Sequence, residues 1–114
     1  MAGHHNIEAM SLALSKLFRY SISNYDDLVA LQEELDAVDN YFLIQNFRFD
    51  NKFIKRFEVD RDTLQHKVPK MLIQPLVENA ILHGLEPKVG KGTVIIRAYK
   101  TESRLVISVD DVGV

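Results

Sequence analysis

The first 50 residues carry a helical pattern of apolar positions. In the first segment a stripe recurs every three or four residues, widened by Phe18, at Ile7, Met10, Leu14, Leu17 and Ser21. In the second segment a narrow seam steps alternately by three and four, at Leu28, Leu31, Leu35, Val38, Phe42 and Gln45. Residues 23–26 between them are turn-forming, and Asp26 or Asp27 is expected to cap the second helix. The pattern predicts an antiparallel helical hairpin.

A hairpin alone cannot cover both apolar seams. Two partners fit: the remainder of this chain, or a second copy that completes a four-helix bundle. The pattern favours the second copy and leaves both alternatives open.

From about residue 50 the pattern changes. Residues 53–59 read as a strand, and a helix is expected from Val68 and Pro69 to His83, because proline loses nothing in a first turn. Pro75 should bend this helix, and Gly84 should end it in the C′ position.

Two strands are expected after a loop at residues 86–92. They cover 93–100 and 104–110, and residues 101–103 form the hairpin turn. Helices followed by a helix and a hairpin predict an α+β fold.

The helix expected over 69–84 carries the first candidate chemistry. Its apolar arc should lie on the sheet and consists of Leu72, Ile73, Leu76, Val77, Ala80 and Ile81. Asn79 and His83 share a face at the edge of this arc. The Asn79 oxygen suits a magnesium ion, but the residues alone favour an amide that caps a neighbouring loop. The simpler alternative for His83 is an imidazole at the helix end that is favoured by the helix dipole. Glu78 lies on the other flank, where we expect a solvated charge.

The chain end carries the second candidate. Val109 is expected to finish a strand, followed by Asp110, Asp111, Val112 and Gly113. A carboxylate just past a strand could accept the exocyclic amino hydrogens of an adenine. The simpler alternative is a charged turn.

Composition excludes several classes of protein. The 114 residues contain no Cys, which excludes disulfide scaffolds, thiolate zinc sites and thiol nucleophiles. A formal net charge of −2 gives no electrostatic argument for nucleic acid as a partner. No apolar run is long enough to span a membrane, and no membrane contact is expected of this segment. Residues 1–6 read as a cloning scar.

Several motifs together resemble one family. The stretch KVPKMLIQPLVENAILHGLEP resembles the N box of sensor histidine kinases of the LytS/YesM type. The stretches LSKLFRYSISN and LVALQEELDAVDNYFLIQNFRF are similar to that family's internal histidine-kinase region, in the right order. LVISVDDVGV resembles the start of its G1 box, although Val112 stands where Asn or Asp is usual.

The resemblance implies a domain organisation. Residues 7–50 would be the helical hairpin of the dimerisation region, which is half of a dimerisation bundle. Residues 51–114 would be the first half of a Bergerat-type ATPase domain of the GHKL group, a partial α/β sandwich. The resemblance further implies a bacterial two-component signalling protein, of which this chain would be a cytoplasmic segment, with a membrane-anchored receptor as parent.

The resemblance also implies site residues and partners. ATP and Mg²⁺ would be the cofactors: Asn79 would hold the magnesium, Asp111 would bind the adenine, Gly113 would let the backbone approach the nucleotide, and His83 would line the phosphate side. Glu78 is a weak catalytic candidate. The parent would phosphorylate a histidine and pass the phosphoryl group to a response regulator, working as a dimer of two copies.

Departures from the family pattern limit what this chain should do alone. The acceptor motif Asn-Pro-His-Phe-Leu is absent, and His4, His5 and His66 are poor substitutes. The ATP lid and the G2 box are also absent, so the isolated chain is expected to be inactive. The alternatives are a non-catalytic dimerising module, or another GHKL-type ATPase; the upstream helices disfavour the latter.

Overall fold

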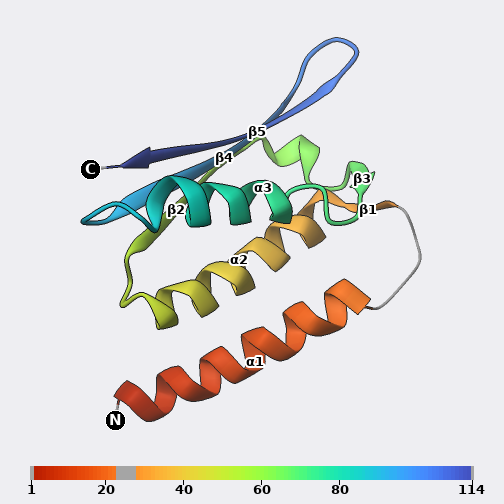
Figure 1. The fold of residues 1–114 in the computed structure, drawn as a ribbon. Helices are drawn as coiled ribbons and strands as arrows, with labels where there is room; N and C mark the ends of the chain where they lie inside the picture. Colours follow the sequence, from red (N-terminus) through yellow and green to blue (C-terminus); the bar gives the residue numbers. More distant parts are fainter. Residues whose placement is uncertain (1, 23–27, 114) are drawn as a thin grey trace.

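The computed structural model describes the backbone of residues 2–22 and 28–113, and the side chains of residues 7–22 and 28–112. The fold is α+β, as predicted (Figure 1). A three-stranded sheet lies on one side, α2 and α3 cover one of its faces, and α1 lies beyond α2 (Figure 1).

The sheet has the order β2-β4-β5. Strand β2 (Phe53–Val59) runs parallel to the central strand β4 (Gly92–Lys100), and β5 (Leu105–Gly113) runs antiparallel to β4. The predicted hairpin is confirmed, with its turn closed by a hydrogen bond from Thr101 N–H to the Arg104 oxygen at 2.8 Å. The last strand is longer than predicted. It continues through both aspartates to Gly113, so Asp111 lies within a strand and not after one.

The two N-terminal helices are α1 (Ala2–Ile22) and α2 (Leu31–Arg48). The seam of α2 is buried from Leu31 to Gln45, but Leu28 is exposed and belongs to a short strand, β1 (Leu28–Ala30). Helix α2 starts after Ala30, whose N–H donates to the Glu33 carboxylate. The expected caps Asp26 and Asp27, and the turn at 23–26, lie outside the described residues.

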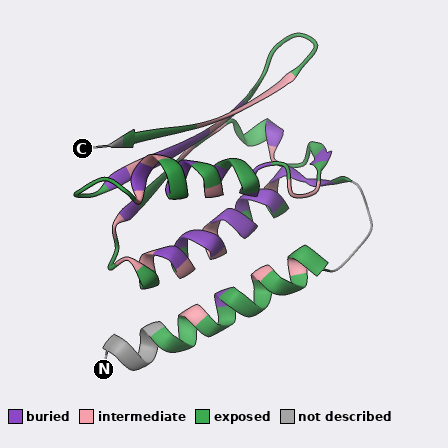
Figure 2. Ribbon diagram, viewed as in Figure 1, coloured by how far each residue is buried: buried purple, intermediate pink, exposed green. Residues whose placement is uncertain are grey.

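The seam of α2 packs on the rest of this chain. Its side chains share one core with β2, β4 and the helices after residue 73, built around Leu35, Val38, Phe42, Ile73, Val77, Ile81, Val94 and Ile96. For the seam of α2, the prediction that the remainder of this chain covers it is therefore confirmed. The core also crosses residue 50, so the helix assigned to the hairpin packs directly on the sheet layer (Figure 2).

Helix α1 is different, because its apolar side chains stay largely exposed (Figure 2). Ala13 is buried on α1, whereas Ile7 and Leu14 are each 53% exposed and Phe18 is 61% exposed. None of the described helices is long and apolar enough to cross a membrane.

The helix expected from Val68 and Pro69 to His83 starts later in the chain. Residues Lys67–Pro69 form β3, which pairs antiparallel with β1, and η1 (Arg61–Thr63) precedes it. Met71 has a φ of 64°, which no right-handed helix contains, so the chain reaches helical geometry only in α3 (Gln74–Asn79). Pro75 therefore sits in the first turn, where its missing N–H is harmless, and does not bend the helix.

Candidate functional site

The helix that carries the predicted residues widens halfway along. After α3 the chain continues as η2 (Ala80–Leu85), a π-type stretch in which Glu86 N–H donates to the Ile81 oxygen at 2.7 Å, five residues back. Such stretches are rare and often occur at functional sites. Gly84 consequently lies inside η2 and is not the C′ residue that its position after His83 suggested.

Buried side chains hold this helix on the sheet. Ile73, Val77 and Ile81 are fully buried, and Ala80 is 8% exposed. The predicted arc is too wide, because Leu72 and Leu76 are 40% and 46% exposed. Leu72 precedes the helix, so a wheel drawn from residue 69 places it wrongly.

Asn79 lies on the exposed side of the helix. Among the described residues its carboxamide makes no hydrogen bond, so it does not tie down a neighbouring loop here. His83 is exposed on the next turn. Both side chains are therefore available to a bound molecule.

Glu78 is half-buried and not fully solvated, contrary to expectation. Its carboxylate accepts a hydrogen bond from Gln74 Nε2 at 2.9 Å. The pKa of Tyr41 on α2 is raised to about 12, mainly by burial and secondly by the negative charge of the nearby Glu78 carboxylate. Glu78 therefore belongs to the contact between α3 and α2, in a pair with the buried Gln74.

Asp111 meets the helix at Gly84. A Cβ added to Gly84 would lie 2.7 Å from Asp111 Oδ2 and 2.9 Å from Oδ1, closer than side chains approach one another. Asp111 pairs in register with the fully buried Val94 of β4, which places both on the helix-covered face. The structure thus brings together Asp111 and a glycine that sequence reasoning treated only as a helix end.

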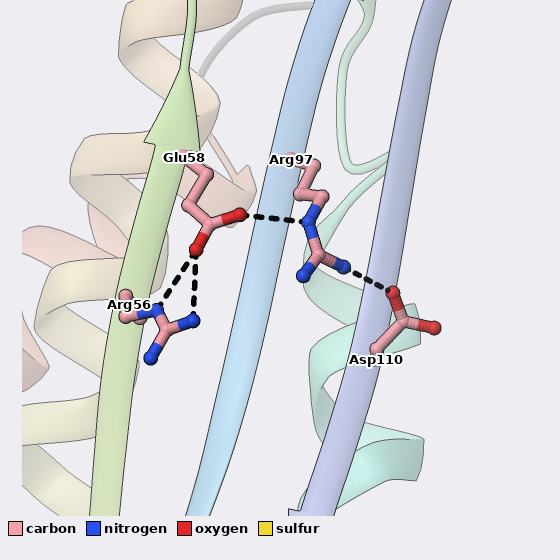
Figure 3. Close-up of polar contacts among 4 residues, drawn as sticks. All are labelled: Arg56, Glu58, Arg97 and Asp110. Atoms are coloured by element: carbon pink, nitrogen blue, oxygen red, sulfur yellow. Dashed lines mark hydrogen bonds and ion pairs between the residues drawn. The ribbon is translucent and has the colours of Figure 1, made fainter.

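Asp110 points to the opposite face of the sheet. There Arg97 donates to Asp110 at 3.0 Å and to Glu58 at 2.8 Å, and Glu58 also accepts from Arg56 at 2.9 Å (Figure 3). The hydrogen bonds from Arg97 and then Arg56 lower the pKa of Glu58. This ladder of charges ties the three strands together on the face away from the helices.

The donor set fits a magnesium nucleotide. Asn79 offers an unpaired neutral oxygen, which suits Mg²⁺, a cation that keeps several waters and few protein ligands. Asp111 is exposed and offers carboxylate oxygens to an amino group. No group of three or more His, Asp or Glu side chains in the described part of the chain could enclose a metal alone. Gly113 ends β5 in register with Gly92 of β4, whose helix-covered side is closely packed by the Leu85 side chain.

A hollow of about 560 Å³ lies elsewhere. It is lined by Ala9 of α1, by the second half of α2 including the buried Phe42, and by residues between 50 and 55, and it includes none of the predicted site residues.

Comparison with known proteins identifies the family. A family model described as histidine kinase matches residues 1–53. The sensor histidine kinase YpdA of Escherichia coli is 39% identical over 101 residues, covering 88% of this chain and 18% of that protein. The sensor histidine kinase YesM of Bacillus subtilis is 37% identical over 107 residues, covering 94% and 18%. The sensor protein LytS of Staphylococcus saprophyticus is 35% identical over 103 residues, covering 90% and 17%.

The chain thus spans less than a fifth of the length of these curated relatives. The match to YesM spans 94% of this chain, so it extends well beyond residue 53 into the sheet layer. Together, the family model and these relatives show that the chain belongs to the sensor histidine kinases of the LytS/YesM type.

Proposed function

We propose that this chain supplies part of the ATP site of a two-component sensor histidine kinase. The observation that carries the proposal is the carboxylate of Asp111 lying over Gly84, on the helix whose exposed edge presents Asn79. The kinase binds Mg-ATP, phosphorylates a histidine and passes the phosphoryl group to a response regulator. The segment lies in the cytoplasm of a membrane-anchored bacterial receptor.

Each site residue has one task in this proposal. Asp111 accepts hydrogen bonds from the adenine amino group, and Gly84 leaves room for that carboxylate. Asn79 binds the magnesium ion through its side-chain oxygen. His83 faces the phosphates, and Gly113 lets the nucleotide approach the backbone.

The residues act by placing charge and not by covalent chemistry. Magnesium, when bound, neutralises the charge that develops on the transferred phosphoryl group. Asp111 and Asn79 hold the two ends of the nucleotide so that its γ-phosphate is oriented toward the acceptor, which lowers the entropic barrier. Glu78 is bound to Gln74, so its contribution is to orient the helix and not to accept a proton.

The acceptor histidine lies in a motif that these residues do not contain. We therefore expect no autophosphorylation from the 114-residue chain alone, and the phosphorylated histidine belongs to the parent kinase. The exposed apolar side chains of α1 support dimerisation through a second copy.

A graft tests the proposal. The 107-residue region of Bacillus subtilis YesM that matches this chain is replaced by it, and the hybrid is incubated with γ-labelled Mg-ATP. We expect label on the hybrid. Asn79→Ala should reduce this labelling at least about tenfold, which corresponds to about 1.4 kcal/mol. An unlabelled hybrid that folds and dimerises would reject the proposal.

That negative result would favour a second candidate, a dimerising module without catalysis. The exposed side chains Leu14 and Phe18 of α1 are the observation that supports it. Titration calorimetry of the 114-residue chain separates the two: Mg-ATP binding that weakens in Asn79→Ala is expected of the kinase only.

A further inference from the structure

A buried carboxylate joins α1, α2 and the entrance of α3. Glu34 of α2 is 1% exposed. Its Oε1 accepts a hydrogen bond from Ile73 N–H at 3.0 Å, and its Oε2 accepts one from Met71 N–H at 3.0 Å. Oε2 also accepts a short hydrogen bond from the Tyr20 hydroxyl of α1. Three segments distant in sequence thus share one side chain.

The two backbone bonds hold the start of α3. Ile73 is its N-cap residue and has no side-chain oxygen with which to satisfy a free amide, so Glu34 satisfies one from another helix. Met71 is held at a φ of 64°, a strained conformation for a side chain of this size. Without these bonds, two amides would be left unpaired beside a buried carboxylate, which is costly.

The position of Asn79 depends on this anchor. Asn79 lies six residues after Ile73, roughly 9 Å along the helix. The segment between them is a single continuous helical rod, fixed on the core by Val77. A rotation or slip at Ile73 therefore moves Asn79 relative to Asp111 on β5.

Tyr20 brings α1 into the same anchor. Burial, together with the hydrogen bond and charge of Glu34, raises the pKa of Tyr20 well above its usual range, so the hydroxyl stays a donor. The Lys70 ammonium lies 5.0 Å from the centre of the Tyr20 ring, a second contact between α1 and the turn before α3. The C-terminal end of α1 and the N-terminal ends of α2 and α3 gather at one end of the molecule (Figure 1).

We infer that Glu34 is a positioning residue for the nucleotide helix, and that Tyr20 makes this positioning respond to the placement of α1. The inference deepens the proposed function, because it names the contact through which α1 would regulate the ATP site. A shift of α1 that withdraws the Tyr20 hydroxyl changes the bonding of the Oε2 atom that also holds Met71. Asn79 then moves without any change in the residues that touch nucleotide.

The test uses nuclear magnetic resonance of the 114-residue chain without nucleotide. Tyr20→Phe removes the hydroxyl alone, and Tyr99→Phe on β4 is the matched control. We expect Tyr20→Phe to shift the backbone amide signals of Met71 and Ile73 and the side-chain amide signals of Asn79, and Tyr99→Phe to shift none of them. Changes confined to α1 and α2 would overturn the inference.

Glu34→Gln provides a second measurement. It keeps the size of the side chain and removes its charge, and we expect hydrogen exchange at the Ile73 amide to accelerate by about tenfold, as for the loss of a bond to a charged group. Unchanged exchange would contradict the role of Glu34. If Glu34→Gln does not fold, the signals of Tyr20→Phe still decide the question.

The YesM hybrid tests the regulatory consequence. In the proposed kinase, Tyr20→Phe should raise the KM for Mg-ATP about threefold or more with kcat nearly unchanged, as for loss of uniform binding. An unchanged KM would overturn the regulatory role. If the hybrid is inactive but the Asn79 signals move, the proposed function fails and the coupling through Glu34 stands.

Discussion

Asp110 and Asp111 are consecutive residues of β5 whose carboxylates serve opposite faces of the sheet. Asp110 accepts from Arg97 at 3.0 Å on the open face, whereas Asp111 lies over Gly84 on the helix-covered face. The alternation of side chains along a strand dictates this division. Only Asp111 can therefore meet a nucleotide that binds beside the helix.

The pair offers a matched comparison in the YesM hybrid. Asp111→Asn replaces one carboxylate oxygen with a donor, and we expect Mg-ATP affinity to fall by about tenfold or more, since a bond to a charged group contributes about 1.5–3 kcal/mol. Asp110→Asn should leave the affinity within about twofold, because an exposed ion pair contributes little. Titration calorimetry measures both, and equal losses would contradict the assignment of Asp111.

The contact between Gly84 and Asp111 predicts a coupled effect on stability. Gly84→Ala forces a Cβ to within 2.7 Å of the exposed carboxylate, which must turn away, and we expect it to lower the free energy of unfolding by about 0.5–1.5 kcal/mol. In an Asp111→Ala background the same change should cost markedly less, because the obstructing atoms are gone. Urea unfolding of the four proteins gives the double-mutant cycle, and additive effects would argue against the contact.

Periodicity predicted the elements that are regular and failed where tertiary contacts decide. The strand at residues 53–59 and the hairpin after residue 92 follow from alternation and turn residues, and both are confirmed. The start of α3 does not follow from periodicity. Met71 is held in a left-handed conformation by Glu34, 37 residues earlier in the chain, and no local pattern contains that bond.

In the candidate site too, some residues could be predicted from the sequence, whereas others depend on tertiary contacts. Asn79 and Asp111 could be selected from residue type and family resemblance, and their exposure agrees with a binding role. Gly84 was assigned to the end of a helix because glycine is common there. Its packing against Asp111 depends on the π-type stretch of η2, for which the residues themselves give no clear signal.

Lys52 secures the loop after η2. Its ammonium donates to the backbone carbonyl oxygen of Glu86 at 2.5 Å and to that of Lys88 at 2.6 Å. We expect Lys52→Met to lower the free energy of unfolding by about 1.5–3 kcal/mol, as for loss of a charged hydrogen bond. Lys100→Met at the exposed end of β4 is the control and should change it by less than about 0.5 kcal/mol. Urea unfolding measures both, and similar values for the two variants would contradict the role of Lys52.

Glu58 should make stability depend on pH. Its pKa is lowered in the folded chain from the ordinary value of 4.5, chiefly by hydrogen bonds from Arg97 and Arg56. A lowered pKa stabilises the folded state above the unfolded value, and this contribution is lost as pH falls through the folded value. We expect the stability difference between the wild-type chain and Glu58→Gln to shrink from pH 6 to pH 3, measured by urea unfolding. A difference that stays constant over this range would show that the charge of Glu58 has no role.

The exposed stripe of α1 predicts self-association of the chain. Phe18 is 61% exposed and Leu14 53% exposed, on a helix whose buried contacts lie on the side facing α2. If a second copy covers Phe18, Phe18→Gln should weaken association about tenfold or more, because burying such a side chain contributes about 1.5–3 kcal/mol. Ser15→Gln, an exposed change on the same helix, should have little effect. Sedimentation equilibrium measures all three proteins, and a wild-type chain that stays monomeric at high concentration would show that α1 does not pair with a second copy.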